Sequence, residues 1–245
     1  MRIVSWNVHR CIGTDGHYRP DRVAEVLRSL SADVIALQEI DSSLRAEGEI
    51  DQLSYLARAL GMHSVMGPTL TREYGAYGNA LLTNFEILGY QEFDLSYRRF
   101  EPRGALSVRL RARGAELQVV NTHLGLKHWE RSFQVDRLLR EILEGIDGLT
   151  IVIGDFNEWF PLSPNNLRLH RRFHSRCPRV PTFPSAWPRF ALDRIFFSKP
   201  VAGLAFEVPR TGAVRVASDH LPIAAEFAFP CAIEKVPARA VQIPP

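Results

Sequence analysis

The chain has 245 residues, enough for one large domain or two small ones. Hydrophobic residues make up 46% of it and charged residues 23%, so a wholly disordered chain is excluded and a globule with a sizeable core is expected. The formal net charge of +3 does not by itself indicate a nucleic-acid-binding protein. We expect a single domain over residues 1–229, followed by a poorly ordered, proline-containing tail at 230–245.

The cysteines and the apolar runs set the expected location of the chain. Cys11, Cys177 and Cys231 have unrelated spacings and form no CxxC pair, so neither a disulfide framework nor a structural zinc site is expected. No run of eighteen apolar residues occurs, and the first residues lack the apolar stretch of a signal peptide. A cytoplasmic, reducing location without a transmembrane segment is therefore expected, and no protein partner is predicted.

The first part of the chain alternates strands with helices. Residues 3–8 and 33–37 read as apolar strands, and between them a helix begins at Pro20 with apolar residues at the spacing of one buried face. Asp51 is expected to cap a second helix, which Gly61 ends. Further strands are predicted at 63–66 and 80–83.

The second part repeats this pattern. We expect a helix over 130–144, with Phe133 on its buried face, and strands at 106–110, 116–122, 150–153, 192–197 and 221–229. In both parts the order is strand, helix, and a strand that ends in an acid. This arrangement predicts two sheets that face each other, with helices outside.

A basic, proline-rich segment interrupts the second part. Between Glu158 and Asp193 there is no Asp or Glu, and six prolines between 161 and 188 predict a long irregular loop rather than a helix. Such a segment suits an anion-attracting surface, and a solvated loop with scattered arginines is the alternative. Its arginines are Arg168, Arg171, Arg172, Arg176, Arg179 and Arg189.

Polar side chains recur at the ends of the predicted strands, where a rigid scaffold can direct them into one cleft. They are Asn7, Glu39, Asn79, His123, Asp155 with Asn157, Asp193, and Asp219 with His220. Glu39 follows an apolar strand and is a candidate ligand for Mg²⁺, which prefers oxygen donors, whereas a lone glutamate at such a place is otherwise an exposed charge. Their number, more than any single member, indicates a catalytic cleft.

The spacing of these residues suggests roles in hydrolysis. Asp155 and Asn157 stand two apart, so in extended backbone their side chains point to the same side, where they could hold a water. The alternative is a turn in which both cap their own backbone. His220 and the adjacent Asp219 would point to opposite sides, which leaves Asp193 as the carboxylate that orients His220, unless this histidine is simply part of the core.

Arg103 precedes the strand at 106–110, and its planar guanidinium suits a phosphate clamp. Taken by itself, an arginine after a proline is more often a surface residue.

The strand-end motifs, in this order, resemble those of the endonuclease/exonuclease/phosphatase superfamily, in a bacterial subgroup of unassigned substrate. The resemblance implies a DNase I-like fold of the α/β (α+β) class, a four-layer αββα sandwich of two β-sheets flanked by helices. The matching strings are Ser5-Trp6-Asn7-Val8, Leu37-Gln38-Glu39, Gly78-Asn79-Ala80, Asn121-Thr122-His123-Leu124, Gly154-Asp155-Phe156-Asn157, Leu192-Asp193-Arg194 and Ser218-Asp219-His220-Leu221-Pro222.

The resemblance also implies roles for individual residues. Glu39 would be the principal Mg²⁺ ligand, with Asn7 and Asp219 nearby. The resemblance gives the remaining residues catalytic and phosphate-binding roles: Asp155 activates the attacking water, Asn157 contacts the phosphate, Asp193 orients His220, His123 contacts the phosphate or donates a proton, and Asn79 hydrogen-bonds the phosphate.

The expected activity is a metal-dependent phosphoesterase that hydrolyses a phosphodiester of nucleic acid or phospholipid type, with Mg²⁺ as cofactor and Mn²⁺ as a substitute. Two alternatives stay open. One is a phosphomonoesterase in which the segment 160–190 closes over a small phosphorylated substrate. The other is a non-catalytic binding module with the same fold.

Overall fold

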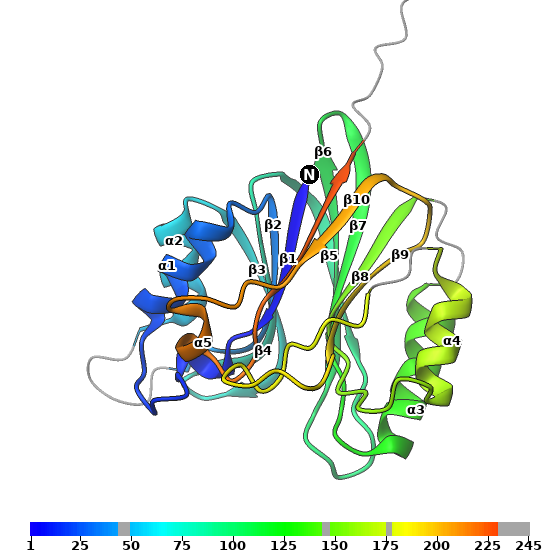
Figure 1. Cartoon of the computed structure of the whole chain (residues 1–245), viewed down its shortest axis with the longest axis horizontal. Coiled ribbons are helices and arrows are strands. Elements are labelled where there is room, and N and C mark those ends of the chain that lie inside the picture. The colour runs from blue at the N-terminus through cyan, green and yellow to red at the C-terminus, as the bar shows by residue number, and fades with distance from the viewer. Residues whose placement is uncertain (44–49, 144–147, 175–177, 230–245) are drawn as a thin grey trace, which may run out of the picture.

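The computed structural model describes residues 1–43, 50–143, 148–174 and 178–229. They form a four-layer sandwich in which two β-sheets face each other and helices cover the outer face of each sheet (Figure 1). This is the predicted α+β, DNase I-like arrangement. The expected tail at 230–245 lies outside the described residues.

The first sheet has six strands in the order β10-β11-β1-β2-β4-β3. β1 pairs with β2 in parallel, and the other neighbours are antiparallel. The strands are β1 (Arg2–Asn7), β2 (Val34–Asp41), β3 (His63–Arg72), β4 (Gly75–Thr83), β10 (Ala202–Glu207) and β11 (Ile223–Ala228).

The second sheet has five strands in sequence order, from β5 to β9, and its one parallel pair is β7 with β8. The strands are β5 (Glu86–Asp94), β6 (Gly104–Ala112), β7 (Ala115–His123), β8 (Leu149–Asp155) and β9 (Asp193–Phe197). β1, β2, β7 and β8 all end at the lower end of the molecule as drawn in Figure 1. The side chains at their carboxyl ends are therefore brought together.

Helices cover both sheets. α1 (Pro20–Leu30), α2 (Gln52–Leu60) and the short α5 (Val214–Ala217) lie on the first sheet, and α3 (His128–Arg137) and α4 (Pro164–Arg172) lie on the second (Figure 1). A 3-10 turn, η1 (His9–Cys11), follows β1, and a π-helical turn, η2 (Leu138–Ile142), continues α3. The predicted ends of α2 are confirmed: the Asp51 side chain accepts from the Ser54 amide at 3.2 Å, and Gly61 ends the helix with φ of 66°.

Apolar packing fills the three spaces between the four layers. The central one lies between the sheets and includes Ile3, Leu106, Ile153 and Phe197, all of them fully buried. The other two lie under the helices and enclose, for example, Trp6 on one side and Phe156 on the other. No helix among the described residues has the length and apolar character needed to cross a membrane.

The structure corrects the prediction of a continuous irregular loop between 161 and 188. Residues Pro164–Arg172 form α4, because Ser163 caps the first turn by accepting from the Asn166 amide at 3.1 Å, and a proline is tolerated at the first helical position. The remaining prolines lie outside this helix. Proline content alone therefore gave the wrong structure for this stretch.

The third predicted helix differs in its end and in one buried residue. Regular α-helix ends at Arg137, and η2 carries the chain to Ile142. Phe133, expected on the buried face, is 37% exposed. Its ring instead lies 5.1 Å from that of Tyr97, on the β5–β6 loop. The predicted end at Glu144 lies outside the described residues.

Candidate active site

A side-chain amide joins two of the predicted site residues across the two sheets. Asn7, at the end of β1, donates to Oε1 of Glu39 at 3.0 Å and lies 3.2 Å from Oδ2 of Asp155. β1 and β2 belong to the first sheet and β8 to the second, so this amide bridges the gap between them. Two carboxylates are thereby held on either side of one polar group.

Glu39 is set apart from its strand by an irregular backbone. Its φ is 59°, a left-handed value that costs free energy for any residue other than glycine, and the β2–β4 register shifts between Leu37 and Ile40. The preceding Gln38 points between the sheets and donates to Oδ1 of Asn121 at 2.7 Å. Because Gln38 is anchored inside, Glu39 is turned toward the half-exposed end of the sheet.

Asp155 is buried at the end of β8. Its Oδ1 accepts from the Asn157 amide at 2.9 Å, and Asn157 adopts a left-handed φ of 48° that allows this close turn. Burial, together with the nearby Asp193 carboxylate, raises the pKa of Asp155 to about 6, although the positive His220 opposes the rise. A carboxyl with this pKa changes protonation state near neutral pH.

His220 and Asp193 form a buried pair beside Asp155. Nδ1 of His220 lies 2.9 Å from Oδ2 of Asp193, and Nε2 lies 3.6 Å from Oδ2 of Asp155. Burial opposes a charge on the ring, but the two carboxylates outweigh it and raise the pKa of His220 to about 10. Trp6 fixes the backbone here by donating to the His220 carbonyl at 2.8 Å.

His123 occupies the opposite side of Asp155 and carries no charge. Nδ1 of His123 lies 3.1 Å from Nη1 of Arg103, and a guanidinium can only donate, so Nδ1 is the acceptor. Burial is the main cause that holds the pKa of His123 well below its usual value, and the positive charges of Arg103 and His220 act in the same direction. Nε2 of His123 lies 3.5 Å from Oδ2 of Asp155 and 3.1 Å from Nδ2 of the Asn157 side chain.

Arg103 and Asn79 reach the site from opposite sheets: Arg103 directly precedes β6, whereas Asn79, expected at a strand end, lies in the middle of β4. Arg103 is almost fully buried, and its Nη2 donates to Glu101 at 3.0 Å. Asn79, on β4, donates to the Gly104 carbonyl at 2.9 Å and so ties the first sheet to the start of β6. In this arrangement the side chain of Asn79 holds the backbone beside Arg103.

Asp219 lies at the margin of this group. Its carboxylate is half-buried and lies 3.3 Å from the Ser218 hydroxyl, which donates its one proton to the Asn7 carbonyl at 2.7 Å. Among the described residues it makes no hydrogen bond or ion pair with Glu39. The structure thus places Asp219 close to Asn7 through Ser218.

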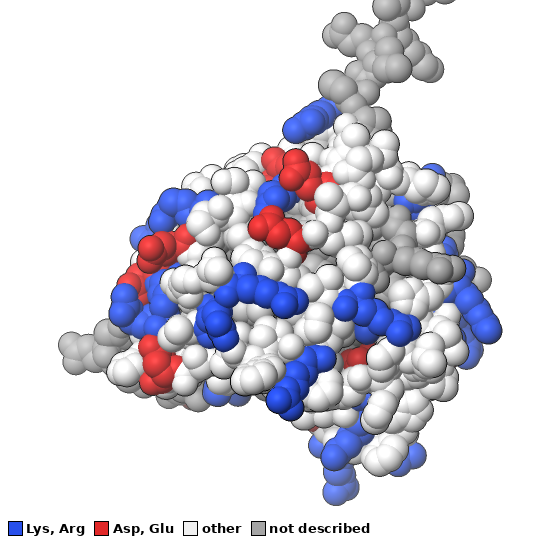
Figure 2. Space-filling model, viewed as in Figure 1, with Lys and Arg blue, Asp and Glu red and all other residues white. Residues whose placement is uncertain are grey.

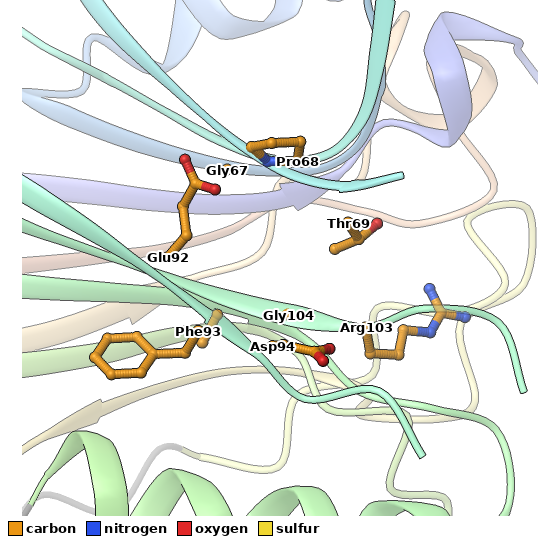
Figure 3. Close-up of a pocket in the computed structure, with 9 residues that line it drawn as sticks. Gly67, Pro68, Thr69, Glu92, Phe93, Asp94, Arg103 and Gly104 are labelled. Atoms are coloured by element: carbon orange, nitrogen blue, oxygen red, sulfur yellow. The ribbon is translucent and has the colours of Figure 1, made fainter. Parts of the chain in front are cut away.

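A hollow of about 280 Å³ adjoins the site at the open edge between the two sheets. Pro68 and Thr69 of β3 lie on one side of it, and Glu92, Asp94 and Arg103 lie on the other (Figure 3). The Arg103 guanidinium is directed away from the part of the hollow near Glu92. The hollow therefore runs along the sheet edge and is lined by two acidic side chains, Glu92 and Asp94, and by the basic Arg103.

Sequence reasoning missed the polar contacts that position the strands and loops of the candidate site. Asn121 donates to the carbonyls of Leu37 and Ala80 at 2.8 and 2.9 Å and so locks β7 to the first sheet. Asn121 and Gln38 both stood inside matched motifs, but only their neighbours were assigned roles. A partner on the opposite sheet cannot be read from a local pattern.

Tyr77 was also not assigned a role. It is largely buried, and this burial is the main cause that raises the pKa of its hydroxyl far above the usual value. The negative charges of Glu39 and Glu101 raise it further. Tyr77 therefore keeps its proton beside Glu39 and offers a neutral donor there.

A buried ion pair connects two of the loops that carry site residues. Arg131 of α3 makes a two-pronged contact with Glu158, at 3.2 and 3.3 Å, and donates to the carbonyls of Gly125 and Leu126. Asn165 of α4 also donates to Glu158, at 3.0 Å. The loop after His123 and the loop after Asp155 are therefore held together by one guanidinium.

The donor set is compatible with a divalent cation in two ways. Asp155, Asp193 and His220 offer ligand atoms within 4.8 Å of one another. His220 is already hydrogen-bonded to Asp193 and has a raised pKa, and a protonated imidazole cannot be a ligand. Glu39, with Asn7 and Asp219 nearby, is the alternative ligand group. Its donors are oxygen atoms, which suit Mg²⁺ better than an imidazole does, and no histidine has to lose a proton for the cation to bind.

The chain belongs to the endonuclease/exonuclease/phosphatase family, whose sequence pattern matches residues 4–220. It is 29% identical over 246 residues to the uncharacterized protein YbhP of Escherichia coli K12, with 93% of this chain and 96% of that protein covered. Members of this superfamily are hydrolases of phosphate esters.

Two solved structures illustrate the shared fold. A mannosyl-6-phosphatase from Bacteroides thetaiotaomicron is 18% identical with a TM-score of 0.72, over 94% of this chain and 100% of that one. The catalytic domain of human Nocturnin with bound sulfate is 22% identical with a TM-score of 0.72, over 94% and 93%. The predicted four-layer architecture is thus confirmed.

Proposed function

We propose that this chain is a metal-dependent phosphodiesterase in which Asp155 activates the attacking water. The observation that carries the proposal is the convergence of three side chains on one carboxylate oxygen. Oδ2 of Asp155 faces the Asn7 amide at 3.2 Å, His123 at 3.5 Å and His220 at 3.6 Å. These groups come from both sheets, so a phosphate bound in front of them would be contacted from several sides.

Asp155 is suited to act as the general base. Its pKa of about 6 leaves it ionised at neutral pH yet basic enough to accept a proton from water. Asn157 is held beside it by the left-handed turn, where its side-chain amide donates to the Leu124 carbonyl at 2.9 Å. We assign Asn157 the role of keeping the water and the phosphate in register.

His220 supplies positive charge to the phosphate. Its pKa of about 10 keeps it protonated at neutral pH, and Asp193 fixes the ring through Nδ1. The remaining proton is on Nε2, which lies 3.6 Å from Oδ2 of Asp155, and there it would stabilise charge on a phosphoryl oxygen or be given to the leaving oxygen. Asp193 acts through His220, as a positioning residue.

The neutral His123 and the positive Arg103 would contact the phosphate on the other side. Arg103 donates to Nδ1 of His123, so the neutral ring carries its proton on Nε2, 3.5 Å from Oδ2 of Asp155. Asn79 would contribute through the Gly104 backbone that it holds, or directly to the phosphate. The charged donor His220 and the neutral donor His123 therefore lie on opposite sides of Asp155.

Glu39, with Asn7 and Asp219, would hold the metal, for which we propose Mg²⁺ with Mn²⁺ as a substitute. A cation bound there supplies neutralisation of the phosphate charge and Lewis acidity. The support for this assignment is the half-exposed Glu39, which is turned toward the cleft and fixed by the Asn7 amide.

Hydrolysis of bis-p-nitrophenyl phosphate and of p-nitrophenyl phosphate, each measured with Mg²⁺ and after chelation, tests the proposal. We expect the diester to be the better substrate and chelation to abolish activity. Asp155→Asn and Glu39→Gln should each reduce kcat by about a hundredfold or more. Glu86→Gln, on the exposed edge strand β5, is the matched control and should retain full activity. Activity that survives both site substitutions would refute the assignment.

A phosphomonoesterase is the second candidate, and one feature favours it. The Phe183 ring lies 4.8 Å from that of His220, and Trp159 packs against both Phe183 and Phe190. These aromatic rings pack beside His220, where they would form one wall of a site for a small substrate. Faster hydrolysis of the monoester than of the diester in the same assay would favour this candidate.

A further inference from the structure

The exposed apolar side chains of this protein are concentrated at the end of the molecule that carries the candidate active site. Every exposed phenylalanine, tryptophan and leucine of the described part lies in residues 95–103, 124–133, 158–174 or 178–190, which we call the apolar rim. These side chains are Phe100, Leu126, Trp129, Phe133, Phe160, Leu162, Leu167, Trp187 and Phe190. The large apolar side chains exposed elsewhere are three tyrosines and one valine.

The rim segments are loops, the first part of α3 and the whole of α4, and several of them directly follow or precede the site residues. Leu126 and Trp129 follow His123, and Phe160 and Leu162 follow Asn157. The β5–β6 loop and the start of α3 lie at the lower end of the sandwich in Figure 1, where β7 and β8 end, and α4 runs upward from there along the second sheet. Leu162 is 74% exposed and Phe160 is 72% exposed, which no packing within the described residues explains. A cluster of this kind marks an interaction surface.

Part of the rim is continuous from the β5–β6 loop to α4. Tyr97 stacks with Phe100 at 6.1 Å and tilts against Phe133 at 5.1 Å. A hollow of about 480 Å³ is lined by Arg98, Arg99, Phe100 and Trp129. Trp129 also borders a second hollow, of about 420 Å³, together with Phe133 and Arg168. Aromatic rings and arginines thus alternate across this surface.

The exposed charges of the rim are almost all positive. Glu130 and Glu158 are buried, which leaves Glu101 as the exposed carboxylate among the described rim residues. Basic side chains project over the lower part of the face seen in Figure 2. The exposed cations of the rim are Arg98, Arg99, Lys127, Arg171, Arg172, Arg179 and Arg189. The partner that fits this surface is therefore anionic and also accepts apolar side chains.

We propose that the apolar rim docks this protein on a lipid bilayer that contains anionic headgroups. Tryptophan and arginine are suited to the headgroup region, and leucine and phenylalanine to the acyl chains below it. Arg98 lies over the Tyr97 ring and Arg189 over the Trp187 ring, so each cation is held beside an apolar anchor. Docking in this way brings the end of the molecule that carries His123 and Asp155 to the headgroups.

An unpaired nucleic-acid strand is the other anionic partner, and the leucines disfavour it. Single strands bind to such surfaces through stacking of bases on aromatic rings. Leu126 is 59% exposed and Leu162 74% exposed, and neither offers a ring face. A bilayer receives aliphatic and aromatic side chains alike. The docking proposal does not depend on the phosphoesterase reaction, because binding is measured without turnover.

Sedimentation with vesicles tests the proposal on the full chain. We expect the protein to bind vesicles of equal parts phosphatidylcholine and phosphatidylglycerol, with weaker binding to phosphatidylcholine alone and at high salt. Leu126→Ser/Trp129→Ser should weaken binding to the mixed vesicles by more than about tenfold, because both anchors are lost. Arg98→Gln/Arg99→Gln should reduce the preference for the anionic vesicles.

The matched control is Tyr74→Ser/Tyr90→Ser. These tyrosines are each 59% exposed, close to the 59% of Leu126 and 57% of Trp129, but they lie outside the rim. The control should bind as the unchanged protein does, and circular dichroism should be the same for all variants. Equal losses in the rim and control variants, or no binding to mixed vesicles, would overturn the proposal. So would tighter binding to a single-stranded oligonucleotide that the rim substitutions abolish.

Discussion

Nδ1 of His220 lies 2.9 Å from Oδ2 of Asp193, and both side chains are almost completely buried. An imidazole in such surroundings would ordinarily be neutral, because burial disfavours the charged ring. Here the carboxylate of Asp193, supported by that of Asp155, raises the pKa of His220 to about 10. The same cleft contains His123, whose pKa is lowered by burial and by the charge of Arg103. Two histidines on either side of one carboxylate therefore carry different charges.

This difference predicts distinct NMR titrations of the two rings in the metal-free protein. His220 should remain protonated from neutral pH up to about pH 10, and His123 should be neutral at pH 7. Asp193→Asn should lower the pKa of His220 markedly, because the nearer of its two negative partners is removed. Titration of His220 near the ordinary value of about 6.5 in the unchanged protein would contradict the proposed pairing.

The same pKa predicts how the stability of the metal-free protein depends on pH. The folded-state pKa of His220 lies above the unfolded value of 6.5, so its stabilising contribution is complete below pH 6.5 and is lost as the pH rises through about 10. The free energy of unfolding, measured with urea across that range, should fall with increasing pH. Asp193→Asn should flatten this dependence, whereas Glu86→Gln, on an exposed strand, should leave it unchanged.

Loss of the buried Arg131–Glu158 pair should be costly. Glu158→Gln leaves the buried guanidinium of Arg131 without its counter-ion, which typically destabilises a protein by about 3–5 kcal/mol. Urea unfolding measures this change. Activity should fall as well, because the loops after His123 and Asp155 lose their common support. Glu141→Gln, in the exposed Arg137–Glu141 pair on the same helix system, is the control and should have a much smaller effect. Equal effects of the two substitutions would refute this role.

The elements that the sequence predicted best are those whose side chains are covered on both faces. Val34–Asp41 and Leu149–Asp155 are buried along most of their length, so their apolar runs were visible, although the first strand was predicted to end before Glu39 and in fact continues to Asp41. β5 was missed because Glu86–Asp94 is mostly exposed or half-exposed and contains neither a clear alternation nor an apolar run. An edge strand of this kind is defined by its neighbour β6 rather than by its own pattern.

The structure brings the predicted site residues together, but only one of their connections was predicted. Adjacent side chains in extended backbone point to opposite sides, so Asp193 rather than Asp219 was expected to orient His220, and the two do form a hydrogen bond. The contact between Gln38 and Asn121 joins residues 83 positions apart, on different sheets. Such a contact depends on how the sheets pack, which local periodicity does not encode.

Gly154 should not tolerate a side chain. Its φ of 146° lies in a region that favours glycine, and an added Cβ would lie 1.8 Å from the Thr122 carbonyl oxygen on β7. Gly154→Ala should therefore separate the strands that carry His123 and Asp155, destabilise the protein by at least about 2 kcal/mol and impair activity. Gly212→Ala is the control: its φ is 71°, and an added Cβ meets nothing within 4 Å. If chemical denaturation gives equal losses for both, backbone conformation alone explains the effect.

Thermal unfolding in the presence of Mg²⁺ or Mn²⁺ distinguishes the two groups that could hold the metal. A cation that binds only the folded protein, at a hundred times its Kd, stabilises it by about 2.7 kcal/mol and raises Tm. We expect Glu39→Gln to abolish this rise in Tm and Asp193→Asn to retain it, because Asp193 is engaged with His220. The reverse result would place the cation in the group of Asp155, Asp193 and His220. In that case His220 would have to lose its proton on binding, and the rise in Tm would grow steeply as the pH approaches 10.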